Sequence, residues 1–186
     1  MKPIVFYILL LTLTGCMQPK MGPQPILSKE KRVQYLQEMR QWQASGRIAI
    51  TRGTENINAS FTWKQDGKKY NIVFSSPFSS ETVTVVGDDK QHKVLSCDDE
   101  DDEDMQLEQD LPFAQMAAWI KGAISPTSTP QIITYDRYNQ IRTLQQDGWS
   151  LEFQTYTDCR PVSLPERMTI TDGKTKAKLL IKNWQK

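Results

Sequence analysis

The hydrophobic positions near the start of the mature chain recur at steps of three and four residues, which is typical of an amphipathic helix. Ser28 precedes this stretch and suits the N-cap position, and Gly46 follows it. The pattern therefore predicts a helix over residues 29–43. The apolar positions that carry it are Val33, Tyr35, Leu36, Met39 and Trp42.

After Gly46 the period changes to two, as expected of strands with one buried face. Three Asp-Gly dipeptides, at 66–67, 147–148 and 172–173, favour tight hairpin turns between such runs. Roughly ten antiparallel strands in a meander predict a sheet that curls towards a barrel. The runs lie near residues 46–52, 57–65, 68–75, 80–86, 91–96, 131–135, 139–145, 149–156, 166–171 and 176–183.

A second helical pattern interrupts the meander at Phe113, Met116, Ala117 and Ile120, and Gly122 suits its C-terminal stop. The apolar faces of both helices have to pack against the concave side of the curled sheet. Periodicity leaves two alternatives open at this point. The sheet and helices enclose either a solid core or a hydrophobic cavity under a helical lid.

The first residues have the features of a bacterial lipoprotein signal peptide. A basic residue, Lys2, precedes a short apolar run over residues 4–13, and Leu13-Thr14-Gly15-Cys16 fits the lipobox. The run is too short for a membrane-spanning helix, which needs roughly 20 apolar residues. We expect a signal peptide over 1–15, a lipidated and Pro-rich tether over 16–27, and a single domain over 28–186, with acyl chains on Cys16.

The charge balance excludes one class of partner. The chain has 23 Lys and Arg against 22 Asp and Glu, and the only charge before Cys16 is Lys2. A nucleic-acid-binding surface needs clustered basic residues, and the sequence has no such block with interleaved aromatic residues. We therefore expect no nucleic-acid partner.

The sequence also offers little catalytic chemistry. Its single histidine, His92, lies in a polar stretch, and neither a nucleophile elbow nor a phosphate-binding glycine loop is present. Seven consecutive acids at 98–104 indicate a solvated loop, with a calcium site as the alternative. We expect no enzyme activity, no cofactor and no resident metal.

Two further features carry open alternatives. In an oxidising compartment Cys97 and Cys159 form either a disulfide or two buried thiols. Phe78 lies at the tip of a Ser-Pro-Phe-Ser turn between two strands, where it either folds back onto the core or projects into a lipid surface.

Several short segments follow one another along nearly the whole chain in a specific order. They are the lipobox Cys16, Trp42, Gly46-Arg47-Ile48-Ala49, Ala59-Ser60-Phe61-Thr62-Trp63, Ser76-Pro77-Phe78-Ser79, Leu111-Pro112-Phe113, Trp119-Ile120-Lys121-Gly122, Leu164-Pro165-Glu166-Arg167-Met168, Thr171-Asp172-Gly173 and Asn183-Trp184. In their order and spacing the chain resembles the LolB family of outer-membrane lipoprotein receptors.

The resemblance implies a mainly β fold, an unclosed antiparallel barrel of ten to eleven strands with a helical lid over a hydrophobic cavity. It implies a monomer that accepts lipoprotein acyl chains from the periplasmic carrier LolA and inserts them into outer-membrane lipid. The family's projecting loop usually has leucine at its tip, where this chain has Phe78. The candidate cavity and lid residues are Phe61, Trp63, Phe74, Phe113, Met116 and Ile120.

The residue after Cys16 is Met17 and not the aspartate linked with inner-membrane retention. We therefore expect the chain on the periplasmic face of the outer membrane. The alternative function is a structural or ligand-binding envelope lipoprotein that transfers nothing.

Overall fold

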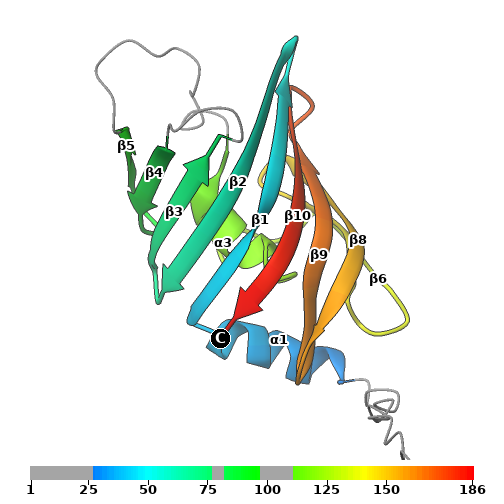
Figure 1. Ribbon diagram of the computed structural model, residues 1–186. Coiled ribbons are helices and arrows are strands. Elements are labelled where there is room, and N and C mark those ends of the chain that lie inside the picture. The colour runs from blue at the N-terminus through cyan, green and yellow to red at the C-terminus, as the bar shows by residue number, and fades with distance from the viewer. Residues whose placement is uncertain (1–26, 77–81, 97–110) are drawn as a thin grey trace, which may run out of the picture.

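The computed structural model describes residues 27–76, 82–96 and 111–186. The elements are α1 (Lys29–Glu38), β1 (Gln41–Arg52), β2 (Glu55–Asp66), β3 (Lys69–Ser75), β4 (Thr82–Gly87), β5 (His92–Ser96), α3 (Phe113–Trp119), β6 (Ile132–Tyr135), β7 (Ile141–Gln146), β8 (Trp149–Cys159), β9 (Val162–Thr171) and β10 (Thr175–Gln185). In the described ranges ten strands form one antiparallel sheet, with α3 on its concave side and α1 across one end of the strands (Figure 1).

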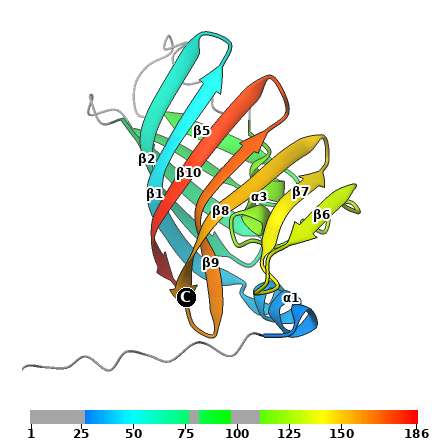
Figure 2. The same cartoon turned by 90° about the vertical axis from the view of Figure 1, so that its right-hand side faces the viewer.

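The sheet does not close into a barrel. Its strand order is β5-β4-β3-β2-β1-β10-β9-β8-β7-β6, so the first strand of the chain pairs with the last and the two middle strands form the edges. Helix α3 is inserted in the chain between those two edge strands, and it lies within the curve of the sheet (Figure 2). The mainly β, unclosed antiparallel architecture expected from the sequence is confirmed.

The three predicted Asp-Gly turns connect β2 to β3, β7 to β8 and β9 to β10. Both residues of the Asp147-Gly148 turn have positive φ angles, 54° and 80°, as a two-residue hairpin turn of the mirror-image type requires. The dipeptides therefore set the register of the meander at three of its corners.

The first helix ends earlier than its pattern predicts. Ser28 caps it by accepting a hydrogen bond from the Lys31 backbone N–H, but the helix stops at Glu38. Trp42 lies in β1 opposite Gln65 of β2 and packs between the rings of Trp63 and Trp184. The predicted end at residue 43 is wrong because strand pairing and aromatic packing stabilise the extended backbone there.

The buried face of α1 differs from the predicted one at its start. Leu36 and the cap residue Met39 are buried as expected, but Val33 is 39% exposed and Arg32 is buried. The strand starts that differ most from prediction are those of β1, which begins at Gln41, and β9, which begins at Val162, before Pro165. Pro165 faces Tyr156 next to an irregularity in the β8–β9 pairing, where a missing N–H is tolerated.

Candidate functional site

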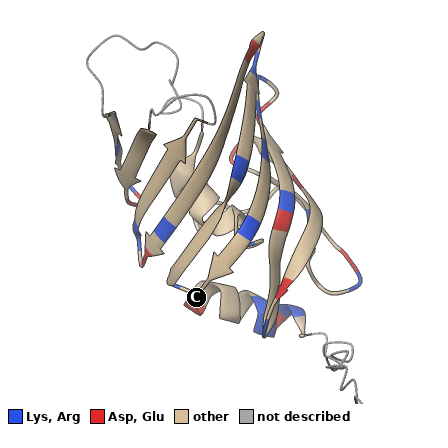
Figure 3. Ribbon diagram, viewed as in Figure 1, with Lys and Arg blue, Asp and Glu red and all other residues tan. Residues whose placement is uncertain are grey.

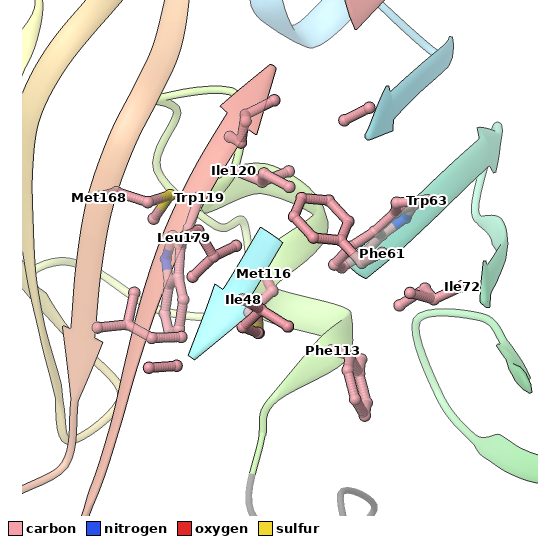
Figure 4. Close-up of a cluster of buried hydrophobic side chains, with 14 of the residues drawn as sticks. Ile48, Phe61, Trp63, Ile72, Phe113, Met116, Trp119, Ile120, Met168 and Leu179 are labelled. Carbon is pink, nitrogen blue, oxygen red and sulfur yellow. The ribbon is translucent and has the colours of Figure 1, made fainter. Parts of the chain in front are cut away.

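The apolar residues of the concave face form one cluster with the inner face of α3 (Figure 4). Alternation in β2 and β3 directs Phe61, Trp63 and Phe74 towards the helix, and all three are buried. From the helix, Phe113, Met116 and Ile120 meet them at helical spacing. The structure thus brings the six candidate cavity and lid residues together in one interior.

Phe113 is the centre of the aromatic contacts at the start of α3. Its ring centroid lies 6.4 Å from those of Trp63 and Tyr70, 6.3 Å from that of Phe74 and 5.8 Å from that of His92. Such ring pairs add about 0.5–1.5 kcal/mol each beyond the burial of area. His92, expected to be an ordinary strand residue, is the first residue of β5 and is exposed.

The end of α3 is held by a different kind of contact, centred on the fully buried Gln146 of β7. The Gln146 side-chain oxygen accepts hydrogen bonds from the Trp119 indole N–H at 2.8 Å and the Ser125 backbone N–H at 3.0 Å. Its amide nitrogen donates to the carbonyls of Ser125 and Ser128, each at 2.7 Å. We call Gln146, Trp119, Ser125 and Ser128 the Gln146 cluster.

The attachment of α3 is therefore asymmetric. Among the residues the structure describes, no hydrogen bond joins residues 111–118 to a strand, so the start of the helix is held by nonpolar contacts. Four directional bonds hold the chain around its end. Nonpolar contacts have no required geometry and exchange readily for other apolar groups, whereas buried hydrogen bonds are costly to break.

Lys121 joins the end of α3 to α1. Its Nζ donates to the backbone carbonyls of Leu36 at 2.8 Å and Met39 at 3.1 Å, at the C-terminal end of α1. A cation at this end complements the helix dipole. Burial nevertheless lowers the pKa of Lys121 to about 8.

A groove of about 840 Å³ lies between α1 and the outer face of α3. The outer face presents Ala114, Ala117 and Ala118, while α1 presents Leu36 and Met39. The groove is open, and its floor shares Leu36, Met39 and Trp42 with the hydrophobic cluster of the concave face.

Arg32 lines one end of the groove and is only 5% exposed. Its Nη1 donates to the carbonyl of Ser163 at 2.9 Å, and its guanidinium lies 5.5 Å from the centre of the Tyr156 ring. Its Nη2 is buried without a hydrogen-bond partner. Burial lowers the pKa of Arg32, since no water solvates the charge.

Sequence reasoning missed Arg32, Lys121 and Gln146. Gln146 lies two residues after the buried Leu144, so strand alternation alone marks it as inward-facing. No comparable signal marks Arg32, which occupies the buried face of α1 in place of the predicted Val33.

Several predicted residues lie outside the described residues: Cys16, the loop-tip Phe78, Cys97 and the acidic run 98–104. Cys159 is the last residue of β8 and is half-buried. The disulfide, the lipidation site and the membrane-facing tip therefore stay predictions. Within the described segments, neither helix has the length and apolar character needed to cross a bilayer.

Comparison with known proteins agrees with this architecture. Proteins named outer-membrane lipoprotein LolB from Halorhodospira halophila and Coxiella burnetii are each 28% identical to the chain. The alignments cover 80% and 81% of this chain and 77% and 74% of those proteins.

Among solved structures, a LolA superfamily protein from Nitrosomonas europaea superposes with a TM-score of 0.53 at 8% identity, covering 86% of this chain and 93% of that chain. At this identity the likeness concerns the fold alone. A family model described as outer membrane lipoprotein LolB matches residues 40–184, from the residue before β1 to the penultimate residue of β10. The chain therefore belongs to the LolB family.

Proposed function

We propose that this protein accepts the acyl chains of lipoproteins from a LolA-type periplasmic carrier and inserts those lipoproteins into the outer membrane. In this role the acyl chains lie between the concave face of the sheet and α3. Lipidation of Cys16 would keep the chain on the periplasmic face of its target membrane, at the end of a Pro-rich tether.

The observation that carries this proposal is the asymmetric attachment of α3 over an apolar sheet. Phe113 and Met116 contact the sheet through apolar atoms, while the Gln146 cluster holds the end of the helix. Displacing the start of α3 would expose an apolar surface without breaking a buried polar bond. The Gln146 cluster would then act as the hinge.

Burial of apolar area is sufficient to drive such an exchange. Each acyl methylene kept from water is worth about 0.8 kcal/mol, and acyl chains displacing α3 would recover contacts that Phe113, Met116 and Ile120 give up. The transfer needs no covalent chemistry. Its direction follows from relative affinity, with the bilayer holding the acyl chains best and the carrier holding them least.

Phe78 is the proposed contact with the membrane. It lies between β3 and β4 in sequence, in the position where the family's loop usually has leucine. Burying one aromatic side chain in a lipid interface yields on the order of 1.5–3 kcal/mol, which is suitable for a reversible contact.

A photo-crosslinking experiment tests the proposed path of the acyl chains. A benzophenone amino acid would replace Phe61, which faces α3, or its neighbour Ser60, which is exposed on the other face of β2. Each chain would be mixed with a carrier loaded with a lipoprotein bearing radiolabelled acyl chains and then irradiated. We expect label on the residue-61 protein and background label on the residue-60 protein.

Equal labelling at both positions, or none at residue 61, would contradict the path between sheet and α3. Labelling at residue 61 without subsequent release to vesicles would instead identify a lipoprotein that binds acyl chains and transfers nothing.

A further inference from the structure

The groove between α1 and α3 combines an apolar floor with basic side chains. Its apolar part comes from α3 and α1, through Ala118, Leu36 and Met39 among others, and from Trp42 of β1. Because Phe113, Met116 and Ile120 occupy the sheet-facing side of α3, the three alanines on its outer side leave room along the helix. The groove has the volume and the apolar lining that an acyl chain needs.

The charges around this groove are mostly of one sign. Its basic lining residues are Lys29, Arg32, Arg40, Lys68 and Lys121. Among the described residues that line it, Asp89 is the one acid, and it pairs with Lys68 at 2.6 Å. Figure 3 shows basic positions on the first turns of α1, while charges of both signs are scattered over the sheet. The groove therefore favours an anion.

Arg32 is the most deeply placed of these cations. A buried guanidinium is costly unless hydrogen bonds and an opposite charge compensate it. The Ser163 carbonyl, the Tyr156 ring and, at longer range, the Asp136 carboxylate compensate it in part, but within the described chain it forms no ion pair. Its Nη2 is left free to donate to a ligand.

Two further buried polar atoms lack a partner. Among the described residues, the buried side-chain nitrogen and oxygen atoms without one are Arg32 Nη2, Trp42 Nε1 and Tyr70 Oη. All three residues contribute to the lining of the groove, and each atom can donate a hydrogen bond, but Tyr70 Oη lies beside Gly87 of β4. Buried polar groups are normally paired, so the unpartnered Arg32 Nη2, which belongs to the one cation of the three, indicates an oxygen acceptor on a ligand.

We propose that the α1–α3 groove binds an acyl lipid with an anionic head group, whose phosphate or carboxylate pairs with Arg32. This goes beyond the proposed function. There the cargo chains lie on the other face of α3, and the ester and amide linkages of a triacylated cysteine carry no anion. The groove lipid is thus a second ligand, bound independently of cargo.

Titration with three amphiphiles of one chain length tests this proposal. The probes are myristate, myristoyl lysophosphatidylglycerol and neutral monomyristoylglycerol, each below its aggregation concentration, with inorganic phosphate as the chain-free arm. Trp42 lines the groove, so tryptophan fluorescence of the full mature chain reports binding, and calorimetry gives the affinity. We expect the anionic lipids to bind at least roughly tenfold more tightly than the neutral one.

Variants separate the head-group site from the chain site. Arg32→Gln should lower the affinity for the anionic lipids to that of the neutral one. Arg137→Gln removes an exposed guanidinium outside the groove and should change nothing. Ala118→Phe fills the groove without touching Arg32, and it should weaken all three lipids. Stronger binding of phosphorylated lipid than of myristate would identify phosphate as the preferred head.

Equal affinity for neutral and anionic lipids would overturn the proposal, as would undiminished binding to the Ala118→Phe chain. Thermal unfolding of each variant is recorded in parallel. If Arg32→Gln fails to fold, the proposal is tested by comparing the affinities of the parent for anionic and neutral lipids and by the loss of binding in Ala118→Phe. None of these outcomes changes the crosslinking expected at residue 61, so the two proposals are tested independently.

Discussion

At the scale of single residues, a few buried polar side chains determine how α3 is held. Gln146 uses both its acceptor and its two donors within the protein, which a buried amide must do to avoid a desolvation penalty. Replacing it removes the partners of four groups at once. The remaining apolar contacts of α3 do not depend on it.

We predict that Gln146→Leu lowers the free energy of unfolding by about 3 kcal/mol, because the Trp119 N–H and the Ser125 backbone groups are left buried and unpaired. Urea denaturation followed by tryptophan fluorescence measures this. Gln145→Leu changes the exposed neighbour and should stay within about 0.5 kcal/mol of the parent. Similar losses for both variants would show that the Gln146 cluster contributes little.

At Gly46 the neighbouring strand leaves no room for a side chain. It lies at a register irregularity between β1 and β10, and a Cβ built there would be 2.0 Å from the Leu180 carbonyl oxygen. The two backbones would have to separate to admit any side chain.

Gly46→Ala should therefore cost about 2–3 kcal/mol of stability, measured by chemical denaturation. Gly53→Ala is the matched control, since its φ of 56° is strained for alanine but nothing lies within 4 Å of the added Cβ. We expect about 1 kcal/mol there. Equal losses of stability in the two variants would show that crowding against the Leu180 backbone does not explain the effect at Gly46.

At the scale of secondary-structure elements, Lys121 couples the two helices. Its Nζ bonds to carbonyls at the end of α1, and burial holds its pKa near 8, below the ordinary value of 10.5. Between these two values the unfolded chain binds a proton that the folded chain has released. Raising the pH through this window consequently stabilises the folded state at this position.

We predict that the unfolding free energy of the parent, minus that of Lys121→Met, becomes more positive as the pH rises from about 7.5 to about 9.5. Because other groups titrate equally in both chains, the difference isolates Lys121. Parallel pH profiles for the two chains would mean that the Lys121 pKa is not depressed by folding.

At the scale of the whole molecule, the open sheet leaves its interior accessible from one side. The first and last strands pair, so the unpaired edges are β5 and β6, and the chain between them carries α3. A closed barrel would exclude a bulky ligand, whereas this sheet has two unpaired edges, and within the described chain α3 covers part of its concave face (Figure 2).

If Phe78 contacts the membrane, acceptance from the carrier and insertion into the bilayer are separable steps. Phe78→Glu should leave acceptance unchanged and slow insertion into liposomes roughly tenfold, because a carboxylate does not enter the lipid interface. Phe78→Leu restores the family's usual residue and should insert at the parental rate. An unchanged insertion rate for the glutamate variant would refute this role.

Much of the fold followed from local patterns. Alternation identified all ten strands, Asp-Gly turns placed three hairpins, and Ser28 marked the start of α1, because these signals depend on near neighbours. The burial of the six candidate cavity and lid residues was predictable, because each combines an inward-facing position with an apolar side chain. Their role in binding acyl chains stays a prediction.

The remaining features depended on contacts between residues far apart in the sequence. Helix α1 stops at Glu38 because β1 pairs with β2, and Arg32 is buried because Ser163 and Tyr156 lie against it. Hydrophobic period and turn chemistry are local properties, so the sequence by itself determined the elements and their order. Alternation could mark Gln146 as inward-facing, but only the tertiary packing decided that Arg32 is buried, which partners Gln146 binds and where a groove stays open, because these depend on neighbours distant in the sequence.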